Sequence, residues 1–302
     1  MEEKNTKLKL VSSVLVFIFL LIIKIYLFGI LNININDLNS TCNTIFNILY
    51  TITSILISTI FYIHLNNKKD LKEFLCKFGK GIGVICTYFI LNELLTLPFL
   101  LAGINYDSVP LTIKVIYAII YEIMMIGIII LILKDEIKKA LNDIKKNHIN
   151  YFSKYIKYWF LALIIMFASN LVITFISKGG IAGNEETIRT IFSQTPVYIF
   201  ISSVFFAPVL EELVFRQGIR NIFSNNLVFI IISGLVFGGL HVVGNINAWY
   251  DILYLIPYCT PGFVFAYILT KTDNIFVPMG LHFLHNGIIM SLQILLMMLG
   301  QI

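Results

Sequence analysis

The chain has 302 residues, of which 58% are hydrophobic and only 13% are charged, and its mean hydropathy is +0.87. A soluble domain is about one-quarter charged, so this composition excludes an ordinary soluble protein and predicts an all-α, polytopic bundle of transmembrane helices. The net charge of +5 comes from lysines in loops, and it does not indicate a nucleic-acid partner.

Nine apolar segments approach the length of about 20 residues that a helical span requires. They are residues 10–31, 44–65, 81–102, 113–133, 158–177, 197–222, 227–243, 252–270 and 275–299. The first follows three lysines but precedes no small-residue cleavage site, so it predicts a retained helix and not a signal peptide. The seventh is short and the eighth is interrupted by Pro257 and Pro261, so eight spans with one broken or re-entrant segment is the alternative.

Lysines alternate from loop to loop in a pattern that predicts the orientation of the chain in the cell membrane. Residues 66–80 carry five lysines and residues 134–157 carry seven, whereas residues 32–44, 103–112 and 244–251 contain neither lysine nor arginine. Because positively charged loops stay in the cytoplasm, we expect the lysine-rich loops and the N-terminus on the cytoplasmic side.

The polar chemistry of the chain is concentrated in its second half. Residues 1–177 supply N-terminal transmembrane helices with few polar features, whereas residues 190–295 carry the groups described below. Residues 178–196 are expected to form an external connector with room for a short interfacial helix. We find no internal repeat.

Two adjacent carboxylates, Glu211 and Glu212, lie inside an apolar stretch and are followed by Arg216. Placing a carboxylate at bilayer depth costs several kcal/mol, so such a residue indicates a functional site. Residues four apart share a helix face, which pairs Glu212 with Arg216, whereas Glu211 is rotated by about 100° and is free to act as a base. Pro208 removes a backbone hydrogen bond and predicts a kink nearby.

Two histidines and an amide lie in the apolar segments that follow. His241 shares a helix face with Phe237, and His282 shares one with Asn286. Counted at 1.5 Å per residue from the neighbouring cytoplasmic links, these polar groups and Glu211 fall roughly 12–23 Å from the same membrane face. We therefore expect one polar cavity among the C-terminal helices, open to the cytoplasm.

Three motifs in this order resemble those of the CPBP family of intramembrane proteases. They are EExxxR from Glu211 to Arg216, FxxxH from Phe237 to His241, and HxxxN from His282 to Asn286. This family joins the CAAX prenyl endopeptidases of the Ras-converting type with the bacteriocin-processing and immunity proteins of the Abi group. The resemblance covers roughly residues 190–295 and implies an endopeptidase that acts in the membrane.

The resemblance also implies a role for each motif residue. Glu211 corresponds to the catalytic glutamate, which would activate the attacking water together with His241. His282 and Asn286 correspond to the pair that stabilises the oxyanion. The remaining motif residues, Glu212 and Arg216, correspond to a structural ion pair. The implied substrate is a membrane-bound peptide or prenylated protein, either a CAAX-type C-terminus or the precursor of a bacteriocin or signalling peptide.

Two alternatives stay open at this stage. A zinc ion held by His241, His282 and Glu211 would make the protein a metalloprotease, but the helices lack the HExxH spacing, so we favour no tightly bound metal and no other cofactor. The second alternative is a non-enzymatic membrane protein, either a small-solute transporter or an immunity or regulatory scaffold. The lack of an internal repeat and the order of the motifs favour the protease. The oligomeric state is not predicted.

Overall fold

The computed structural model of this protein describes residues 2–30, 40–66, 70–246 and 248–299. The regular elements in these ranges are all helices, which confirms the expected all-α fold. The chain packs into two compact units, Met1–Lys77 and Phe78–Ile302, each with its own internal contacts.

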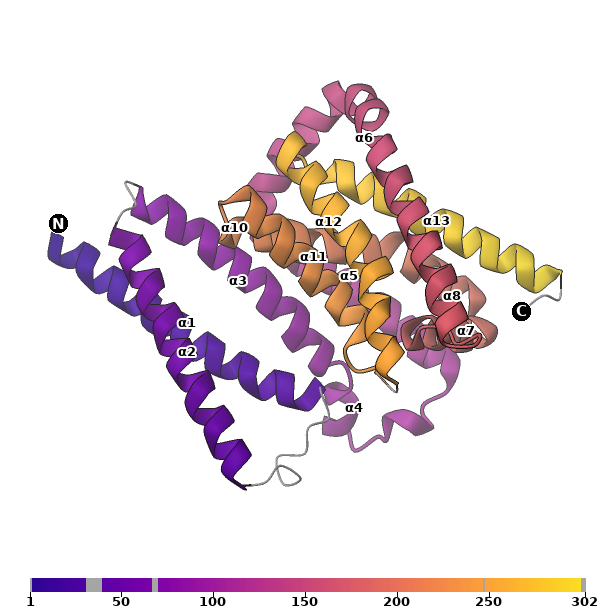
Figure 1. Cartoon of the computed structure of the whole chain (residues 1–302), viewed down its shortest axis with the longest axis horizontal. Coiled ribbons are helices and arrows are strands. Elements are labelled where there is room, and N and C mark those ends of the chain that lie inside the picture. The colour runs from indigo at the N-terminus through magenta and orange to yellow at the C-terminus, as the bar shows by residue number, and fades with distance from the viewer. Residues whose placement is uncertain (1, 31–39, 67–69, 247, 300–302) are drawn as a thin grey trace. The chain divides into compact units, whose positions relative to one another are not determined.

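The first unit contains a pair of long helices, α1 (Glu2–Ile30) and α2 (Ser40–Asn66) (Figure 1). The hydroxyl group of Tyr50 on α2 donates a hydrogen bond to the Leu20 carbonyl of α1 at 2.7 Å, which ties the pair together. Helix α3 (Leu71–Glu93) begins in this unit and continues into the second.

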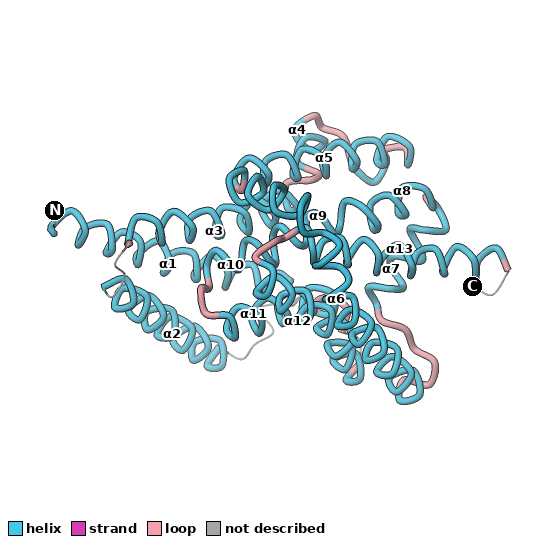
Figure 2. Tube along the Cα trace, turned by 90° about the horizontal axis from the view of Figure 1, so that it is seen from above, coloured by secondary structure: helices cyan, strands magenta, loops and turns pink. Residues whose placement is uncertain are grey.

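The second unit holds the remaining helices, which are joined by short connections (Figure 2). They are α4 (Leu97–Leu101), α5 (Leu111–Ile132), α6 (Lys134–Ile176), α7 (Gly183–Gln194), α8 (Pro196–Ile201), α9 (Ala207–Glu211), α10 (Ile219–Ile222), α11 (Asn226–Val242), α12 (Leu255–Thr272) and α13 (Phe276–Met298). The segment from α8 to α10 is one continuous helical rod that contains two π-helical turns, Ser202–Phe206 and Glu212–Gly218. Helix α7 is the short helix expected in the 178–196 connector.

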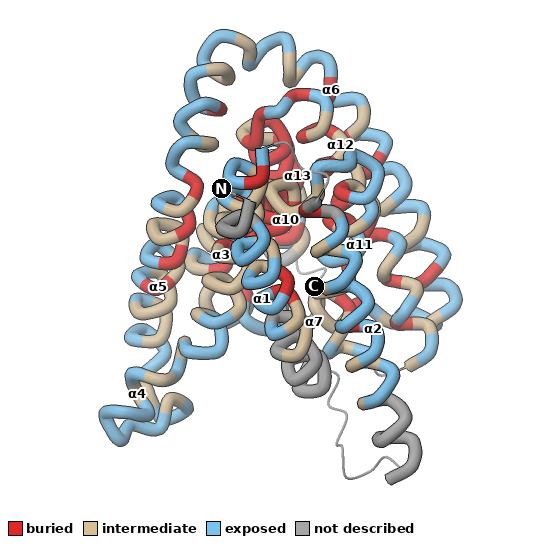
Figure 3. Tube along the Cα trace, turned by 90° about the vertical axis from the view of Figure 1, so that its left-hand side faces the viewer, coloured by how far each residue is buried: buried red, intermediate tan, exposed pale blue. Residues whose placement is uncertain are grey.

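Six of the described helices are long and apolar enough to cross a membrane, and two shorter apolar helices accompany them. The expected polytopic helical bundle is therefore confirmed. Large apolar side chains cover the outer surfaces, as Phe175 with 87% of its surface exposed illustrates, because lipid replaces water around such helices. Buried residues (red in Figure 3) are concentrated in the π turn Glu212–Gly218 and along α12 and α13, which form the interior of the second unit.

Two expected spans have different bounds in the structure. The segment predicted at residues 81–102 ends at Glu93 and is followed by the separate helix α4, because Pro98 has no N–H group with which to continue a preceding helix. The segment predicted at residues 158–177 is the last part of the 43-residue helix α6, whose lysine-rich first part is also helical. Lysine, which is frequent in that first part, favours a helix.

The eighth expected segment is not broken at its prolines, because α12 is one continuous helix. Pro257 lies in the first turn, where no intrahelical donor is needed, and Pro261 removes a single backbone hydrogen bond. Close packing against α11 supports this helix, since a Cβ atom on Gly262 would lie 2.9 Å from the Cα atom of Gly234. Glycines thus let the two backbones touch, as in other close helix pairs in membranes.

A contact between distant segments marks each of the two ends of the second unit. At one end, Lys139 Nζ lies 2.6 Å from Asp273 Oδ2, which joins the start of α6 to the α12–α13 link. At the other end, the Tyr254 hydroxyl donates to the Gly180 carbonyl at 3.0 Å, which joins the start of α12 to the α6–α7 link. We refer to them as the lysine-rich end and the α7 end.

Replacement of Gly238 by alanine is expected to destabilise the second unit, because the added Cβ atom would lie 2.6 Å from the backbone nitrogen of Cys259. Overpacking of this kind costs about 1–3 kcal/mol. Gly239→Ala is the matched control, since nothing lies within 4 Å of the Cβ atom that it adds. Thermal unfolding of both variants in detergent measures the difference, and equal melting temperatures would contradict the close packing of α11 on α12.

Candidate active site

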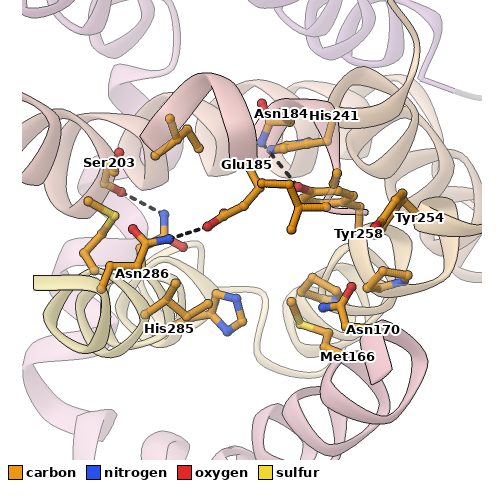
Figure 4. A pocket seen from close by; sticks show the side chains of 18 of the residues that line it. Met166, Asn170, Asn184, Glu185, Ser203, His241, Tyr254, Tyr258, His285 and Asn286 are labelled. Atoms are coloured by element: carbon orange, nitrogen blue, oxygen red, sulfur yellow. Dashed lines mark hydrogen bonds between the residues drawn. The ribbon is translucent and has the colours of Figure 1, made fainter. Parts of the chain in front are cut away.

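A cavity of about 470 Å³ lies among α6, α7, α11, α12, α13 and the segment from α8 to α9 (Figure 4). Four of the residues that the sequence singles out line it, namely Glu211, His241, His282 and Asn286. Glu212 and Arg216 lie behind this lining, with side chains that are completely buried. The structure therefore brings the six predicted site residues into one region of the second unit.

The imidazole of His282 lies between the two adjacent glutamates. Its Nδ1 atom is 2.9 Å from Glu212 Oε1, and its Nε2 atom is 3.6 Å from Glu211 Oε2. An ionised carboxylate can only accept a hydrogen bond, so Nδ1–H donates to Glu212, and this bond fixes the orientation of the ring. The sequence pairs Glu212 with Arg216 alone, whereas the structure gives it His282 as a second partner.

Arg216 is completely buried beside Glu212. Its Nε atom lies 3.3 Å from Glu212 Oε2, although none of its guanidinium nitrogens makes a hydrogen bond to a described residue. The guanidinium carbon lies 4.1 Å from the ring centre of Phe237 and 5.7 Å from that of Phe265. Aromatic faces attract cations, and more strongly where water is excluded. Arg216 therefore compensates the charge of Glu212 while α11 and α12 pack around it.

His241 is held by its own helix and by a stacked tyrosine. Its Nδ1 atom lies 2.8 Å from the Phe237 carbonyl oxygen, which can only accept, so Nδ1 carries a proton and Nε2 is the nitrogen left for other partners. The ring of Tyr258 stacks on it with centroids 4.9 Å apart, and the Tyr258 hydroxyl lies 3.5 Å from Asn184 Nδ2 (Figure 4). Among the described side chains, the ion-pair partner of Glu211 is His282 and not His241.

Asn286 supplies a hydrogen-bond donor that the backbone of a π-helical turn lacks. The N–H group of Ala207 bonds to the Ser202 carbonyl five residues earlier, and the next residue, Pro208, has no N–H group to offer Ser203. Asn286 Nδ2 donates to the Ser203 carbonyl at 2.8 Å and so replaces the missing donor (Figure 4). One N–H of the amide is thus engaged, and the other is free to face the cavity. The kink expected near Pro208 takes the form of this π turn.

The second π turn is supported in the same manner by a neighbouring helix. Ser233 on α11 donates its hydroxyl group to the Phe215 carbonyl. A further contact holds the first π turn from α5, where Glu122 Oε1 accepts a hydrogen bond from Ser202 Oγ at 2.8 Å. π turns inside α-helices are frequent at functional sites, and these two flank the short helix that ends at Glu211.

The arrangement does not fit the zinc site considered above. Among the described residues, no three histidine, cysteine or carboxylate side chains are gathered so as to hold a metal ion. Each ring nitrogen of His282 faces a glutamate, and His241 directs Nδ1 to a backbone carbonyl. A zinc site with two histidines and one glutamate requires three donors that converge on one point, and these side chains do not provide it.

Three residues of the cavity lie outside the sequence motifs. Tyr258 stacks on His241, as described above. His285 is buried, and its Nδ1 atom has no hydrogen bond to a described residue. Glu185 on α7 accepts hydrogen bonds from Arg189 and Gln293. The sequence does not predict these contacts. Those of Tyr258 and His285 depend on helix packing, and Glu185 lies in the 178–196 segment, which was expected to be an external connector.

Comparisons with known proteins agree with the motifs. Residues 193–288 match the protein family described as type II CAAX prenyl endopeptidase Rce1-like. The chain is 26% identical over 223 residues to "Putative membrane peptidase YdiL" of Bacillus subtilis (strain 168), which covers 70% of this chain and 88% of the relative. It is 28% identical over 221 residues to "Membrane-embedded CAAX protease MroQ" of Staphylococcus aureus (strain USA300), which covers 68% of this chain and 86% of the relative. No solved structure matches the chain.

Arg216→Ala is expected to destabilise the fold, because it leaves Glu212 as a buried acid without its cation. Removing one partner of a well-buried pair costs roughly 3–5 kcal/mol. The double variant Glu212→Gln with Arg216→Gln should recover much of the lost expression, since neither charge is then buried. Membrane expression and thermal unfolding in detergent measure both effects. If Arg216→Ala accumulates like the wild type but is inactive, the arginine serves the substrate and not the fold.

Proposed function

We propose that the protein hydrolyses peptide bonds with a water molecule activated by Glu211, because residues 193–288 match the Rce1-like family of type II CAAX prenyl endopeptidases. The observation that carries this proposal is the position of His282, whose ring is held by Glu212 on one side and faces Glu211 on the other. Glu212 is fully buried, whereas Glu211 reaches the cavity. A purely structural cluster would have no need of the second carboxylate.

Peptide hydrolysis needs a base for the water, donors for the oxyanion and a proton for the leaving amine. In the proposed reaction Glu211 takes a proton from the water while the water oxygen bonds to the carbonyl carbon. His241 Nε2 orients this water. Glu211 then passes the proton to the amine nitrogen as the carbon–nitrogen bond breaks.

The tetrahedral oxygen requires donors that are already in place before the reaction. His282 supplies one from Nε2–H, on the side of the ring that faces Glu211 and the cavity. Asn286 supplies another, because only one of its two N–H groups is engaged by the Ser203 carbonyl. These two residues thus keep the oxyanion role that the family resemblance implies.

We propose that the reaction needs no tightly bound metal. Each ring nitrogen of His282 faces a glutamate, and His241 has only Nε2 to offer to a metal. Water activation then falls to Glu211, with His241 orienting the water.

The proposed substrate is a peptide associated with the membrane. Apolar side chains form much of the cavity wall, with Leu163, Met166 and Phe167 on α6 and Ile289 and Met290 on α13. Such a wall suits apolar side chains or a lipid group close to the cleaved bond. A prenylated CAAX-type C-terminus and the precursor of a bacteriocin or signalling peptide both have this character. The similarity to MroQ of Staphylococcus aureus, which is named a membrane-embedded CAAX protease, supports a substrate of the first kind.

Glu211→Gln is expected to abolish cleavage while leaving the protein folded, because the amide keeps the shape of the side chain but cannot take the proton of water. The loss should be on the order of 10³-fold or more. Hydrolysis of a farnesylated CAAX peptide and of an unprenylated apolar peptide in proteoliposomes measures it. Glu186→Gln, an exposed change on α7 that does not line the cavity, is the matched control. Near-wild-type turnover by Glu211→Gln would rule out the assigned base.

Chelators are expected to leave turnover of the purified protein unchanged, because the proposed reaction draws only on carboxylate, imidazole and amide side chains. Elemental analysis should give far less than one zinc per chain in both the wild type and His282→Ala. A stoichiometric zinc that is present in the wild type and absent from His282→Ala would overturn the metal-free reaction.

A further inference from the structure

An arginine outside the sequence motifs lies in the wall of the cavity. Among the described residues that line it, Arg189 of α7 is the one with a permanent positive charge. Its Nε atom donates to Glu185 Oε1 at 2.9 Å, and no other hydrogen bond to a described residue engages its side chain. The two terminal nitrogens therefore keep their N–H groups for a ligand, and 41% of the side-chain surface is exposed.

Glu185 holds this guanidinium in place. Its Oε1 atom accepts hydrogen bonds from Arg189 on the same helix and from Gln293 Nε2 on α13, so the contact also ties α7 to α13 (Figure 4). An arginine that is held through Nε presents its two terminal nitrogens as a fork. Such a fork matches the two oxygens of a carboxylate, which it binds through two parallel hydrogen bonds.

Helix α13 relates the position of this fork to the reacting groups. Asn286 and Gln293 both line the cavity and are seven residues apart, so they share a helix face and lie about 10.5 Å apart along its axis. Asn286 is a proposed donor to the oxyanion, whereas Gln293 contacts Glu185 beside the guanidinium. Ile289 and Met290 form the wall between these two levels. Along α13 the cavity therefore offers an oxyanion donor, then an apolar surface, then a cation.

A CAAX-type substrate has matching dimensions. Three residues follow its modified cysteine, and the last of them carries the terminal carboxylate. At about 3.3–3.6 Å per extended residue, this carboxylate lies about 10 Å beyond the carbonyl group of the cysteine. When that carbonyl group is at Asn286, the apolar residues of the tail pass Ile289 and Met290, and the carboxylate reaches Arg189.

We propose that Arg189 binds the free C-terminal carboxylate of the substrate, three residues beyond the bond that is cleaved. The cleavage rests on the proposed function, whereas the carboxylate site rests on the cavity and the cation in its wall. A carboxylate that leaves water for an apolar cavity is costly unless it is paired, so a substrate with this end group needs such a cation. Arg189 thus selects both the end group of the substrate and the length of its tail.

Two peptides that differ only in their C-terminal group test this site. Both carry a farnesylated cysteine followed by three residues, and one ends in a free carboxylate whereas the other ends in a neutral amide. The wild type should cleave the acid with a kcat/KM about 10–100-fold higher, as expected for hydrogen bonds between charged groups. Arg189→Gln should bring this ratio close to one, and Arg189→Lys should keep part of it. An acid with one additional residue after the cysteine should be cleaved less efficiently by the wild type.

Lys178→Gln is the matched control, because it removes an exposed positive charge from the same connector and does not alter the cavity wall. It should keep the wild-type ratio of acid to amide cleavage. If Arg189 served only to tie α7 to its neighbours, Arg189→Gln would lower cleavage of both peptides alike. An unchanged ratio in Arg189→Gln would therefore overturn the proposal, as would equal cleavage of the two peptides by the wild type.

Peptide binding to Glu211→Gln separates the carboxylate site from the cleavage, because this variant should bind both peptides and cleave neither. Titration of the purified variant with fluorescent forms of the peptides should give a Kd about 10–100-fold lower for the acid. Adding Arg189→Gln in the same background should remove this difference. Acid-selective binding together with a wild type that cleaves neither peptide would refute the protease alone, whereas cleavage without acid selectivity would refute the carboxylate site alone.

Discussion

A carboxylate within a bilayer needs compensation from its neighbours, and Glu212 obtains it from Arg216 and His282. These contacts cross-link the interior of the second unit. Glu212 and Arg216 belong to the α8–α10 segment, His282 belongs to α13, and the rings of Phe237 and Phe265 bring in α11 and α12. The cluster that stabilises the bundle therefore also orients the imidazole of the candidate site, so fold and chemistry depend on the same buried charges.

The backbone of the same segment shows a second constraint of the bilayer. A carbonyl group without a donor is costly where no water can reach it. In the first π turn, Pro208 leaves the Ser203 carbonyl without its helical donor and Asn286 from α13 satisfies it, while in the second Ser233 from α11 donates to the Phe215 carbonyl. Asn286 thus has a structural contact as well as a proposed catalytic one. Its position relative to Glu211 is set by the backbone hydrogen bond and not by packing alone.

The sequence predicts much of the fold, because the hydropathy of a local segment identifies each membrane span and the spacing within a motif indicates which residues share a helix face. It does not predict the contact of His282 with Glu212, since that contact joins helices 70 residues apart in sequence. The spacing argument for Glu212 and Arg216 assumes an α-helix, whereas the structure has a π turn there. The stacking of Tyr258 on His241 depends on glycines that bring α11 and α12 together, and a single sequence does not show which glycines lie in such contacts.

A π turn is in effect an α-helix that contains one additional residue. Loss of one residue from Ser202–Phe206 would return that turn to α geometry and leave the helix beyond it in nearly the same orientation. The π turn therefore absorbs one residue between Pro196 and Glu211 without turning Glu211 away from His282. In a helix of uniform α geometry, the same additional residue would rotate everything beyond it by about 100° and shift it by about 1.5 Å along the axis.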